Sequence, residues 1–307
     1  MPLLGWRSYL SNPTAVSQWP PEATIQTALA SLGVVVGKIR IEPVGARTAR
    51  INVDSNSGEP PIFIHRQRVN DTRIVCSLDE EYLVLKALHS SAPTLVPEPL
   101  GISRLKMDEP FLFVAGVNGR PVGSPERFHT SPDEVLQKIS DALTLFHDAG
   151  RLLDADILHR SVSLARLVQS ASNSRLRGTL VETSLWDRAF QCAARLTIDM
   201  HRNTLLHGDP HAYNLLETDE GLCWIDFERM CVGPRDYDLA QAWVFAYAQA
   251  EAAVKTPWDK SATETQLAFR CLAATAFLEP RKSSWTRPAL QAVAEGLRIA
   301  ISDLASP

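Results

Sequence analysis

Two short polar segments hold the residues of this 307-residue chain whose types and spacing could do chemistry. The first, His207 to Asn214, reads His-Gly-Asp-Pro-His-Ala-Tyr-Asn, and the second, Asp226-Phe227-Glu228, begins twelve residues after Asn214. A carboxylate that can act as a base, an amide oxygen and a second carboxylate suit phosphoryl transfer, because this reaction asks mainly for positioning and for neutralisation of charge. The two segments therefore predict a phosphoryl-transfer site.

The sequence between the two segments predicts how they meet. An apolar run, a turn signal and a second apolar run fill residues 215–225, which is the pattern of a β-hairpin. A turn centred on Asp219 and Glu220 places Asn214 opposite Ile225. The hairpin should then bring the Asn214 amide and the carboxylate of Asp226 to its open end.

The residue types suggest a role for each group. Mg²⁺ takes hard oxygen ligands and keeps several waters, so Asn214 and Asp226 are the expected metal ligands. Asp209 lies on the loop that leads into Asn214 and is expected to orient an acceptor hydroxyl and accept its proton. A zinc site built on His207, Asp209 and His211 is an alternative, but the remaining histidines form no cluster to complete it. In the phosphoryl-transfer interpretation both histidines are structural.

The Asp-x-x-x-x-Asn spacing matches the catalytic loop of protein kinases, and Asp226-Phe227 stands where their metal-binding Asp-Phe-Gly begins. The pattern His-Gly-Asp-x-His-x-x-Asn, together with Gly-x-x-x-x-Asp-Leu-Ala at 233–240, resembles the aminoglycoside phosphotransferase and choline kinase branch of the kinase-like superfamily. This resemblance implies an α+β, bilobal protein-kinase-like fold, with a small antiparallel-sheet N-terminal lobe and a larger, mainly helical C-terminal lobe. It also implies ATP or GTP as cosubstrate, Mg²⁺, and transfer of phosphate to a hydroxyl of a small molecule, in antibiotic resistance or natural-product metabolism.

The same resemblance implies a nucleotide side of the site. Arg66 follows an apolar strand at the place where relatives carry a phosphate-binding Lys or Arg, and Glu81 is the carboxylate expected to hold that cation. Gly45 belongs to the turn expected to cover the phosphates. Backbone groups near Ala115 and Val117, after the strand 111–114, are expected to meet the purine.

Composition narrows the class of partner. Net charge is −4, with charges spread along the chain, so the sequence indicates neither a nucleic-acid footprint nor a membrane surface. The five cysteines lack metal-binding spacing and suit a reducing cytosol. We expect a cytoplasmic protein, a monomer or a homodimer, whose partners are small molecules.

The elements along the chain suggest three regions. Residues 1–33 are expected to form an N-terminal extension and helix, 34–116 the nucleotide-binding lobe, and 117–307 the helical catalytic and acceptor-binding lobe. The expected elements of the first two regions are a helix at 22–32, strands at 34–36, 49–53 and 61–65, a helix at 78–89 and a strand at 111–114. Asp238 is interpreted as the N-cap of a helix that begins at Leu239.

The sequence does not identify the molecule that accepts the phosphate. The segment 240–307 is rich in aromatic residues, which form either a cage for an amine-bearing substrate or ordinary core: Trp243, Phe245, Tyr247, Trp258, Phe269, Phe277 and Trp285. Only six residues separate Asp226 from Gly233, which leaves little room for a peptide-docking loop and disfavours a protein kinase. Two other functions are compatible with the same residues. The protein is then either a catalytically silent nucleotide- or metabolite-binding regulatory protein, or an enzyme that transfers a whole nucleotidyl group.

Overall fold

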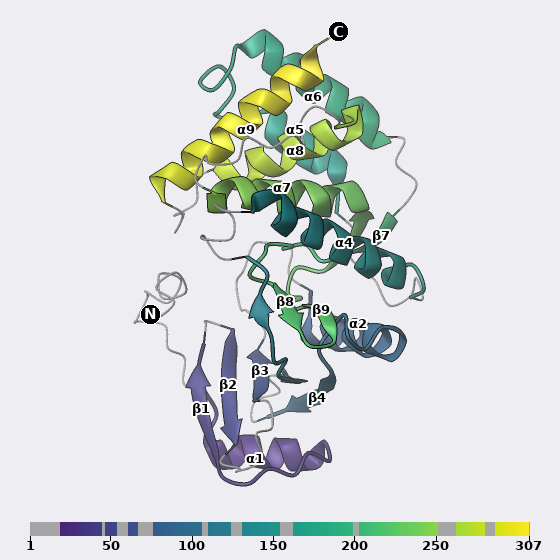
Figure 1. Ribbon diagram of the computed structural model, residues 1–307, viewed down its shortest axis with the longest axis vertical. Helices are drawn as coiled ribbons and strands as arrows, with labels where there is room; N and C mark the ends of the chain where they lie inside the picture. Colours follow the sequence, from purple (N-terminus) through teal and green to yellow (C-terminus); the bar gives the residue numbers. More distant parts are fainter. Residues whose placement is uncertain are drawn as a thin grey trace.

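The computed structural model describes residues 19–44, 47–53, 61–66, 76–105, 110–123, 131–153, 162–198, 203–250, 262–279 and 286–306. These residues form two lobes, one built on an antiparallel sheet and one mainly of helices (Figure 1). The expected α+β bilobal architecture is therefore confirmed.

A five-stranded antiparallel sheet forms the smaller lobe, with strand order β1-β2-β3-β5-β4. Its strands are β1 (Ile39–Pro43), β2 (Thr48–Val53), β3 (Ile62–Arg66), β4 (Pro99–Arg104) and β5 (Pro110–Ala115). The predicted strands at 49–53, 61–65 and 111–114 coincide with β2, β3 and β5. In the register, Ile64 of β3 lies opposite Ala49 of β2 on one side and opposite Phe113 of β5 on the other.

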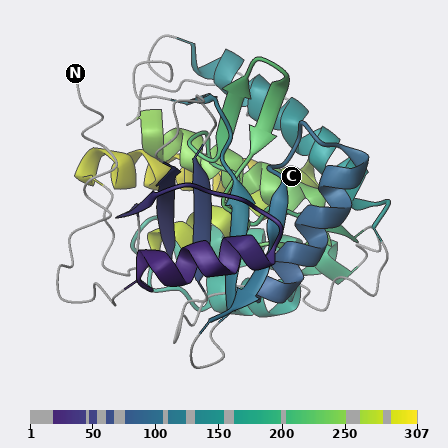
Figure 2. The same cartoon turned by 90° about the horizontal axis from the view of Figure 1, so that it is seen from below.

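Helix α1 (Glu22–Ser31) packs across one face of this sheet (Figure 2). Gly33 follows it with φ of 80°, and the Val34 N–H donates to the Leu29 carbonyl, so the helix ends in a Schellman motif. The strand predicted at 34–36 is wrong, because Val34 is held by this helix end and the strand that follows in the described residues starts only at Ile39.

The two faces of β5 divide the core of the smaller lobe. Phe111 and Phe113 pack with α1, whereas Leu112 and Val114 pack with α2 (Leu78–Ser91). Side chains of successive strand residues point to opposite faces, so this division marks an α1 face and an α2 face of the sheet. The α2 face continues into the core that joins the two lobes.

Short strands flank the polar segments described above, and of these β8 and β9 lie beside α2 (Figure 1). They form a three-stranded sheet of β6 (Arg120–Pro121), β8 (Leu215–Thr218) and β9 (Gly221–Trp224), and a two-stranded sheet of β7 (Asn203–Leu206) and β10 (Cys231–Pro234). Strands β8 and β9 pair from Leu215 with Trp224 to Thr218 with Gly221. The predicted hairpin and its turn at Asp219 and Glu220 are confirmed.

Helices make up most of the larger lobe: α4 (Pro132–Gly150), α5 (Leu164–Ser172), α6 (Thr183–Ile198), α7 (Arg235–Ala250), α8 (Glu264–Leu278) and α9 (Arg287–Ala305). Helix α7 packs against α4, α8 and α9 and therefore runs through the middle of this lobe (Figure 1). Trp186 and Trp243 are fully buried between these helices.

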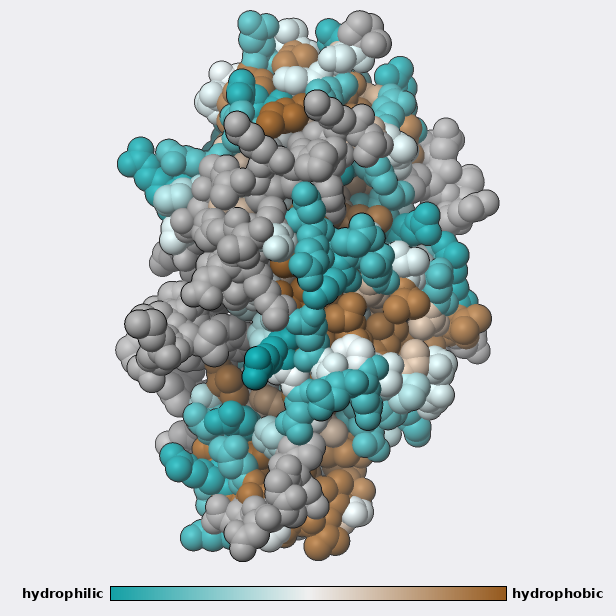
Figure 3. All heavy atoms as spheres, in the orientation of Figure 1, coloured by the Kyte–Doolittle hydropathy of each residue, from teal (hydrophilic) through white to brown (hydrophobic). Residues whose placement is uncertain are grey.

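On the face drawn in Figure 3, hydrophilic residues are interspersed with small groups of hydrophobic ones. The large hydrophobic side chains that are exposed in the described segments are Val35, Leu83, Leu145 and Leu152. In the same segments, no helix combines the length and the apolar character needed to span a bilayer.

Candidate active site

Two loops meet at the open end of the β8–β9 hairpin. The loop 207–214 connects β7 to β8, and the loop 225–230 connects β9 to β10. Because β8 pairs with β9 and β7 pairs with β10, both loops lie side by side. The Ile225 N–H donates to the Asn214 carbonyl at 2.8 Å, which is the juxtaposition that the hairpin predicted.

Asp209 and Asn214 are coupled through the backbone of the first loop. The Asn214 side-chain amide nitrogen donates to the Asp209 carbonyl at 3.0 Å, so its amide oxygen is the atom that could bind a cation. Both side chains are buried, and the Arg229 guanidinium lies 3.5 Å from the Asp209 carboxylate. The site thus presents one carboxylate beside a cation and one oriented amide.

Asp226 has φ of 66° and is the one non-glycine residue with positive φ in the described part of the chain. Such a conformation is strained for an aspartate, and strain of this kind gathers at functional sites. Its side chain is 41% exposed. Desolvation by the surrounding protein atoms, followed by repulsion from Glu228 and Asp209, raises the pKa of Asp226 to about 7. The carboxylates therefore form a cluster with a high affinity for positive charge.

A buried arginine faces this cluster. Arg47, in a bend just before β2, donates to the Glu81 carboxylate of α2, and both side chains are nearly inaccessible to solvent. The same guanidinium lies 3.8 Å from Asp226 and 3.9 Å from Glu228. Burial opposes its charge, but the three carboxylates raise the pKa of Arg47. Burial also raises the pKa of Glu81, and the charge and hydrogen bond of Arg47 oppose this effect.

The structure corrects the expected pairing of Arg66 with Glu81. Arg66 lies opposite Phe111 in the register of β3 and β5, so it shares the α1 face of the sheet. Its guanidinium stacks over the Trp19 ring at 4.8 Å. Glu81 belongs to α2, on the other face, and its partner is Arg47.

The other expected nucleotide contacts lie partly within the described segments. The Ala115 N–H donates to the Glu98 carbonyl at 2.9 Å, and the Gly116 N–H donates to the Pro61 carbonyl at 2.7 Å. A Cβ at Gly116 would lie 2.2 Å from that carbonyl oxygen, so the close approach requires glycine. The Ala115 carbonyl and the backbone of Val117 are the groups that could meet a base. Gly45 lies outside the described residues.

His207 is a structural residue of the first loop. Its Nδ1 accepts from the Asp209 N–H at 3.3 Å, and its Nε2 lies 3.1 Å from the Ile225 carbonyl, so both ring nitrogens serve the backbone. Burial lowers its pKa to about 4, which keeps the ring neutral. With both nitrogens engaged, His207 is not available to bind zinc, and the segments that the structure describes contain no cluster of three His, Cys, Asp or Glu residues suited to a metal.

The N-cap interpretation of Asp238 is wrong, because α7 begins at Arg235 and Asp238 lies within it. Its fully buried carboxylate accepts hydrogen bonds from the N–H groups of His207 and Gly208, at 2.7 and 3.0 Å. His147 Nε2 lies 3.0 Å from the same carboxylate. Asp238 therefore fixes the loop that carries Asp209.

The aromatic residues of the last third of the chain divide in two. Trp243, Tyr247 and Phe269 are buried core. Phe245 and Phe277 are only partly buried, with ring centroids 5.9 Å apart, and the His211 ring lies 5.2 Å from that of Phe245. This second group borders the loop of Asp209. Trp258 and Trp285 lie outside the described residues.

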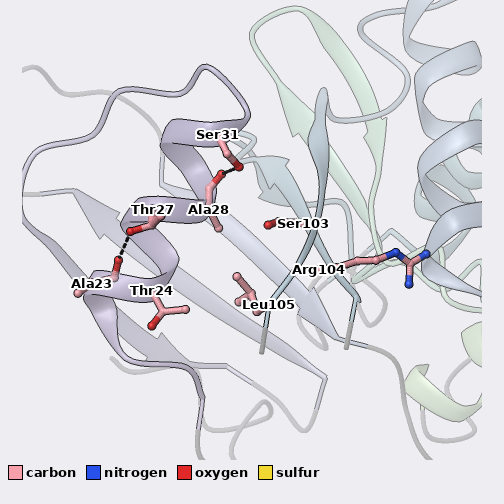
Figure 4. Close-up of a pocket in the computed structure, with 8 residues that line it drawn as sticks. All are labelled: Ala23, Thr24, Thr27, Ala28, Ser31, Ser103, Arg104 and Leu105. Carbon is pink, nitrogen blue, oxygen red and sulfur yellow. Dashed lines mark hydrogen bonds between the residues drawn. The ribbon is translucent and has the colours of Figure 1, made fainter. Parts of the chain in front are cut away.

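A cavity of about 450 Å³ lies elsewhere, between α1 and the end of β4 (Figure 4). The hydroxyls of Thr27 and Ser31 in its wall donate to carbonyls of their own helix. Arg104 points away toward α2, where it pairs with Asp79 at 3.2 Å. Nothing in this wall matches the chemistry of the site above.

The two-lobed fold, with Asp209, Asn214 and Asp226 at the end of one hairpin, is that of a kinase-like protein. Comparison with known families then shows to which family the chain belongs. The model of the family described as "Phosphotransferase enzyme family" matches residues 75–277. The chain therefore belongs to the phosphotransferase enzyme family. No curated protein matches it.

Solved structures share the fold at low sequence identity. An aminoglycoside phosphotransferase-like protein from Ralstonia eutropha is 12% identical with a TM-score of 0.60, and the match covers 92% of this chain and 97% of that one. Choline kinase from Streptococcus pneumoniae is 14% identical with a TM-score of 0.56, covering 93% and 99%. A mutant of aminoglycoside phosphotransferase APH(4)-Ia, in complex with AMP-PNP and hygromycin B, is 12% identical with a TM-score of 0.56, covering 92% and 97%.

Proposed function

We propose that this protein is a Mg²⁺-dependent small-molecule kinase that transfers the γ-phosphate of ATP or GTP to a hydroxyl group. The observation that carries the proposal is the meeting of Asp209, Asn214 and Asp226 at the end of one hairpin. Membership of a phosphotransferase family supports it. Relatives of the same fold solved with AMP-PNP or GDP support a nucleotide as cosubstrate.

The residues present fit a hydrated Mg²⁺ ion. Asn214 has its amide nitrogen engaged and its oxygen available, and Asp226 adds a carboxylate on the neighbouring loop. These two residues would hold the metal, which when bound neutralises charge on the nucleotide phosphates. The chain's own part is then to place the acceptor hydroxyl beside Asp209, whose carboxylate takes the proton as the oxygen attacks phosphorus. The Arg229 guanidinium lies 3.5 Å from this carboxylate.

The nucleobase would lie against the segment after β5. We assign the Ala115 carbonyl and the backbone of Val117 to it, because the Ala115 N–H is already engaged. The lobe boundary would then fall near residue 116, as the sequence predicts.

All five cysteines, which lie in the described segments, are buried thiols that form no disulfide, and this supports the proposed cytoplasmic location.

The experiment is mass-resolved phosphate transfer from ATP and GTP, with Mg²⁺, to a panel of aminoglycosides, amino alcohols, sugars and nucleosides. The comparison variant is Asp209→Asn, which keeps the shape of the side chain but removes the base. If an acceptor gains the mass of one phosphate with the wild type but not with Asp209→Asn, this result establishes the kinase and its substrate class. Gain of a nucleotidyl group would replace the proposal with nucleotidyl transfer, and absence of any nucleotide binding would refute both.

A further inference from the structure

On β3, the face of the sheet that is directed toward Glu81 carries no lysine or arginine in the described residues. His65 lies opposite Leu112 in the register, and Leu112 packs with α2, so His65 lies on that face, which it shares with Phe63. Burial, followed by the charge of Arg47, lowers its pKa well below the ordinary range. A neutral imidazole offers no positive charge to phosphate, and Arg66 is on the opposite face.

Arg47 supplies a cation on this face from another place in the chain. It comes from the bend before β2. The next residue, Thr48, has its hydroxyl 3.5 Å from the His65 ring, so Thr48 of β2 and His65 of β3 lie on this same face of the sheet. One nitrogen of the guanidinium binds Glu81. The other end points toward Asp226 and Glu228, which are on the loop after β9.

Two donors of Arg47 lack an acceptor. Nε and Nη1 are buried and have no hydrogen-bond partner within the described segments, although Arg47 is only 3% exposed. Buried donors without acceptors are costly and rare in folded proteins. Nη1 faces Asp226 across 3.8 Å, too far for a hydrogen bond. The guanidinium is thus anchored at one nitrogen and has unused donors toward the proposed metal ligand.

We propose that Arg47 is the residue that binds the nucleotide phosphates, and that the phosphate-binding cation of this chain has moved from β3 to the bend before β2. The unused Nε and Nη1 donors would bond two phosphate oxygens, and Glu81 would hold the side chain in place. This inference deepens the proposed function and rests on it, since it names the nucleotide contact of the same site.

The test measures Kd for Mg²⁺-ATP and Mg²⁺-GTP by calorimetry, together with Tm, for a set of matched variants. Arg47→Met should weaken binding about 10- to 100-fold, the range for losing hydrogen bonds to a charged group. Arg66→Met, which removes a cation from the α1 face, and Arg50→Met, which removes the exposed partner of Glu42 from β2, should change Kd less than about twofold.

Two further variants separate a lost contact from a lost fold. Arg47→Met with Glu81→Gln removes both charges of the buried Arg47–Glu81 pair, so it should fold and still bind nucleotide weakly. Arg47→Met with His65→Lys returns a cation to β3 on the same face and should recover at least about tenfold of the affinity.

The outcomes separate this inference from the proposed function. Nucleotide binding by wild type that is unchanged in Arg47→Met, or weakened as much by Arg66→Met, would overturn the role of Arg47 and leave the kinase proposal standing. If adding His65→Lys to Arg47→Met restores no affinity, that result would also count against the relocation. A wild type that binds neither nucleotide would overturn the proposed function, and this inference with it.

Discussion

Asp238 holds the backbone of His207, whose N–H donates to the Asp238 carboxylate at 2.7 Å. The two residues are 31 positions apart, and their contact ties α7 to the loop that carries Asp209. The same carboxylate also accepts from the Gly208 N–H and lies next to His147. A fully buried carboxylate with this set of donors is a positioning device for the loop.

Asp238→Asn should lower kcat about 10- to 100-fold while changing KM for nucleotide little. The amide keeps one acceptor oxygen but turns an NH₂ group toward a backbone donor, so one buried N–H is left without a partner. We also expect the free energy of unfolding to fall by about 2–4 kcal/mol. Steady-state kinetics and urea denaturation measure the two effects. Asp236→Asn, on the same turn but partly exposed, is the control, and equal effects of both changes would contradict the role of Asp238.

Gly208→Ala should disable the site through a steric contact. Gly208 has φ of 77°, and a Cβ there would lie 2.0 Å from the Arg229 carbonyl oxygen, so the loop or residue 229 must shift. Gly33→Ala is a matched control, because Gly33 has φ of 80° but open space around the added carbon. Both changes impose left-handed strain of about 1 kcal/mol.

The difference between the two glycine variants isolates the clash. We expect Gly208→Ala to lose more stability than Gly33→Ala and to lose most of its activity, while Gly33→Ala keeps the activity of wild type. Thermal unfolding and phosphate transfer are the measurements. Equal losses in the two variants would mean that backbone strain alone accounts for the effect.

His207 should make the folded state sensitive to acid. Its pKa is about 4 in the folded protein, against about 6.5 for an ordinary histidine, so the unfolded chain takes up the proton first as pH falls. The stabilising contribution is complete above pH 6.5 and is lost as pH falls through about 4. The most that this one group can contribute is about 3 kcal/mol.

His207→Gln removes the titrating ring, so its unfolding free energy should fall less between about pH 7 and about pH 4.5 than that of wild type. Urea denaturation at several pH values gives this comparison, and only the pH dependence is diagnostic, because the variant is also less stable at neutral pH. Parallel curves for the two proteins would show that His207 is not the group responsible.

Local sequence patterns were sufficient for the hairpin and for α2. The turn at Asp219 and Glu220 sits between two apolar runs, and α2 begins with a complete capping box at Ser77 and Glu80, so both elements are determined by neighbours in the chain. The strand predicted at 34–36 does not form, because the Val34 N–H is hydrogen-bonded to the Leu29 carbonyl at the end of the preceding helix. The N-cap interpretation of Asp238 failed because its partners are distant in sequence.

The cation that pairs with Glu81 was missed for a related reason. Arg66 was chosen by its place after an apolar strand, yet the alternation of Ile62 and Ile64 already puts Arg66 on their face of the sheet. That signal was present in the sequence and could have excluded a pairing of Arg66 with Glu81. Nothing local marks Arg47, because its direction is set by a bend and by carboxylates that lie on α2 and on the loop after β9.

Metal-dependent nucleotide binding should weaken below neutral pH. A carboxylate must lose its proton to bind Mg²⁺, and desolvation together with repulsion from Glu228 and Asp209 raises the pKa of Asp226 to about 7. Below that pH the Kd for Mg²⁺-ATP should rise toward about tenfold per pH unit, whereas above about pH 8 it should be level. Calorimetry from about pH 5.5 to about pH 8.5 measures this profile.

Glu228→Gln tests whether the neighbouring carboxylate sets that pH. Removing its negative charge lowers the pKa of Asp226, so the fall in affinity should begin at a lower pH than in wild type. At about pH 8 the variant should bind more weakly, because one charge that attracts the cation is gone. Asp226→Asn, which has no carboxylate to titrate, should lose the metal dependence altogether. A Glu228→Gln profile parallel to that of wild type would show that another group controls the pH dependence, and the repulsion between residues 226 and 228 would then have no functional consequence.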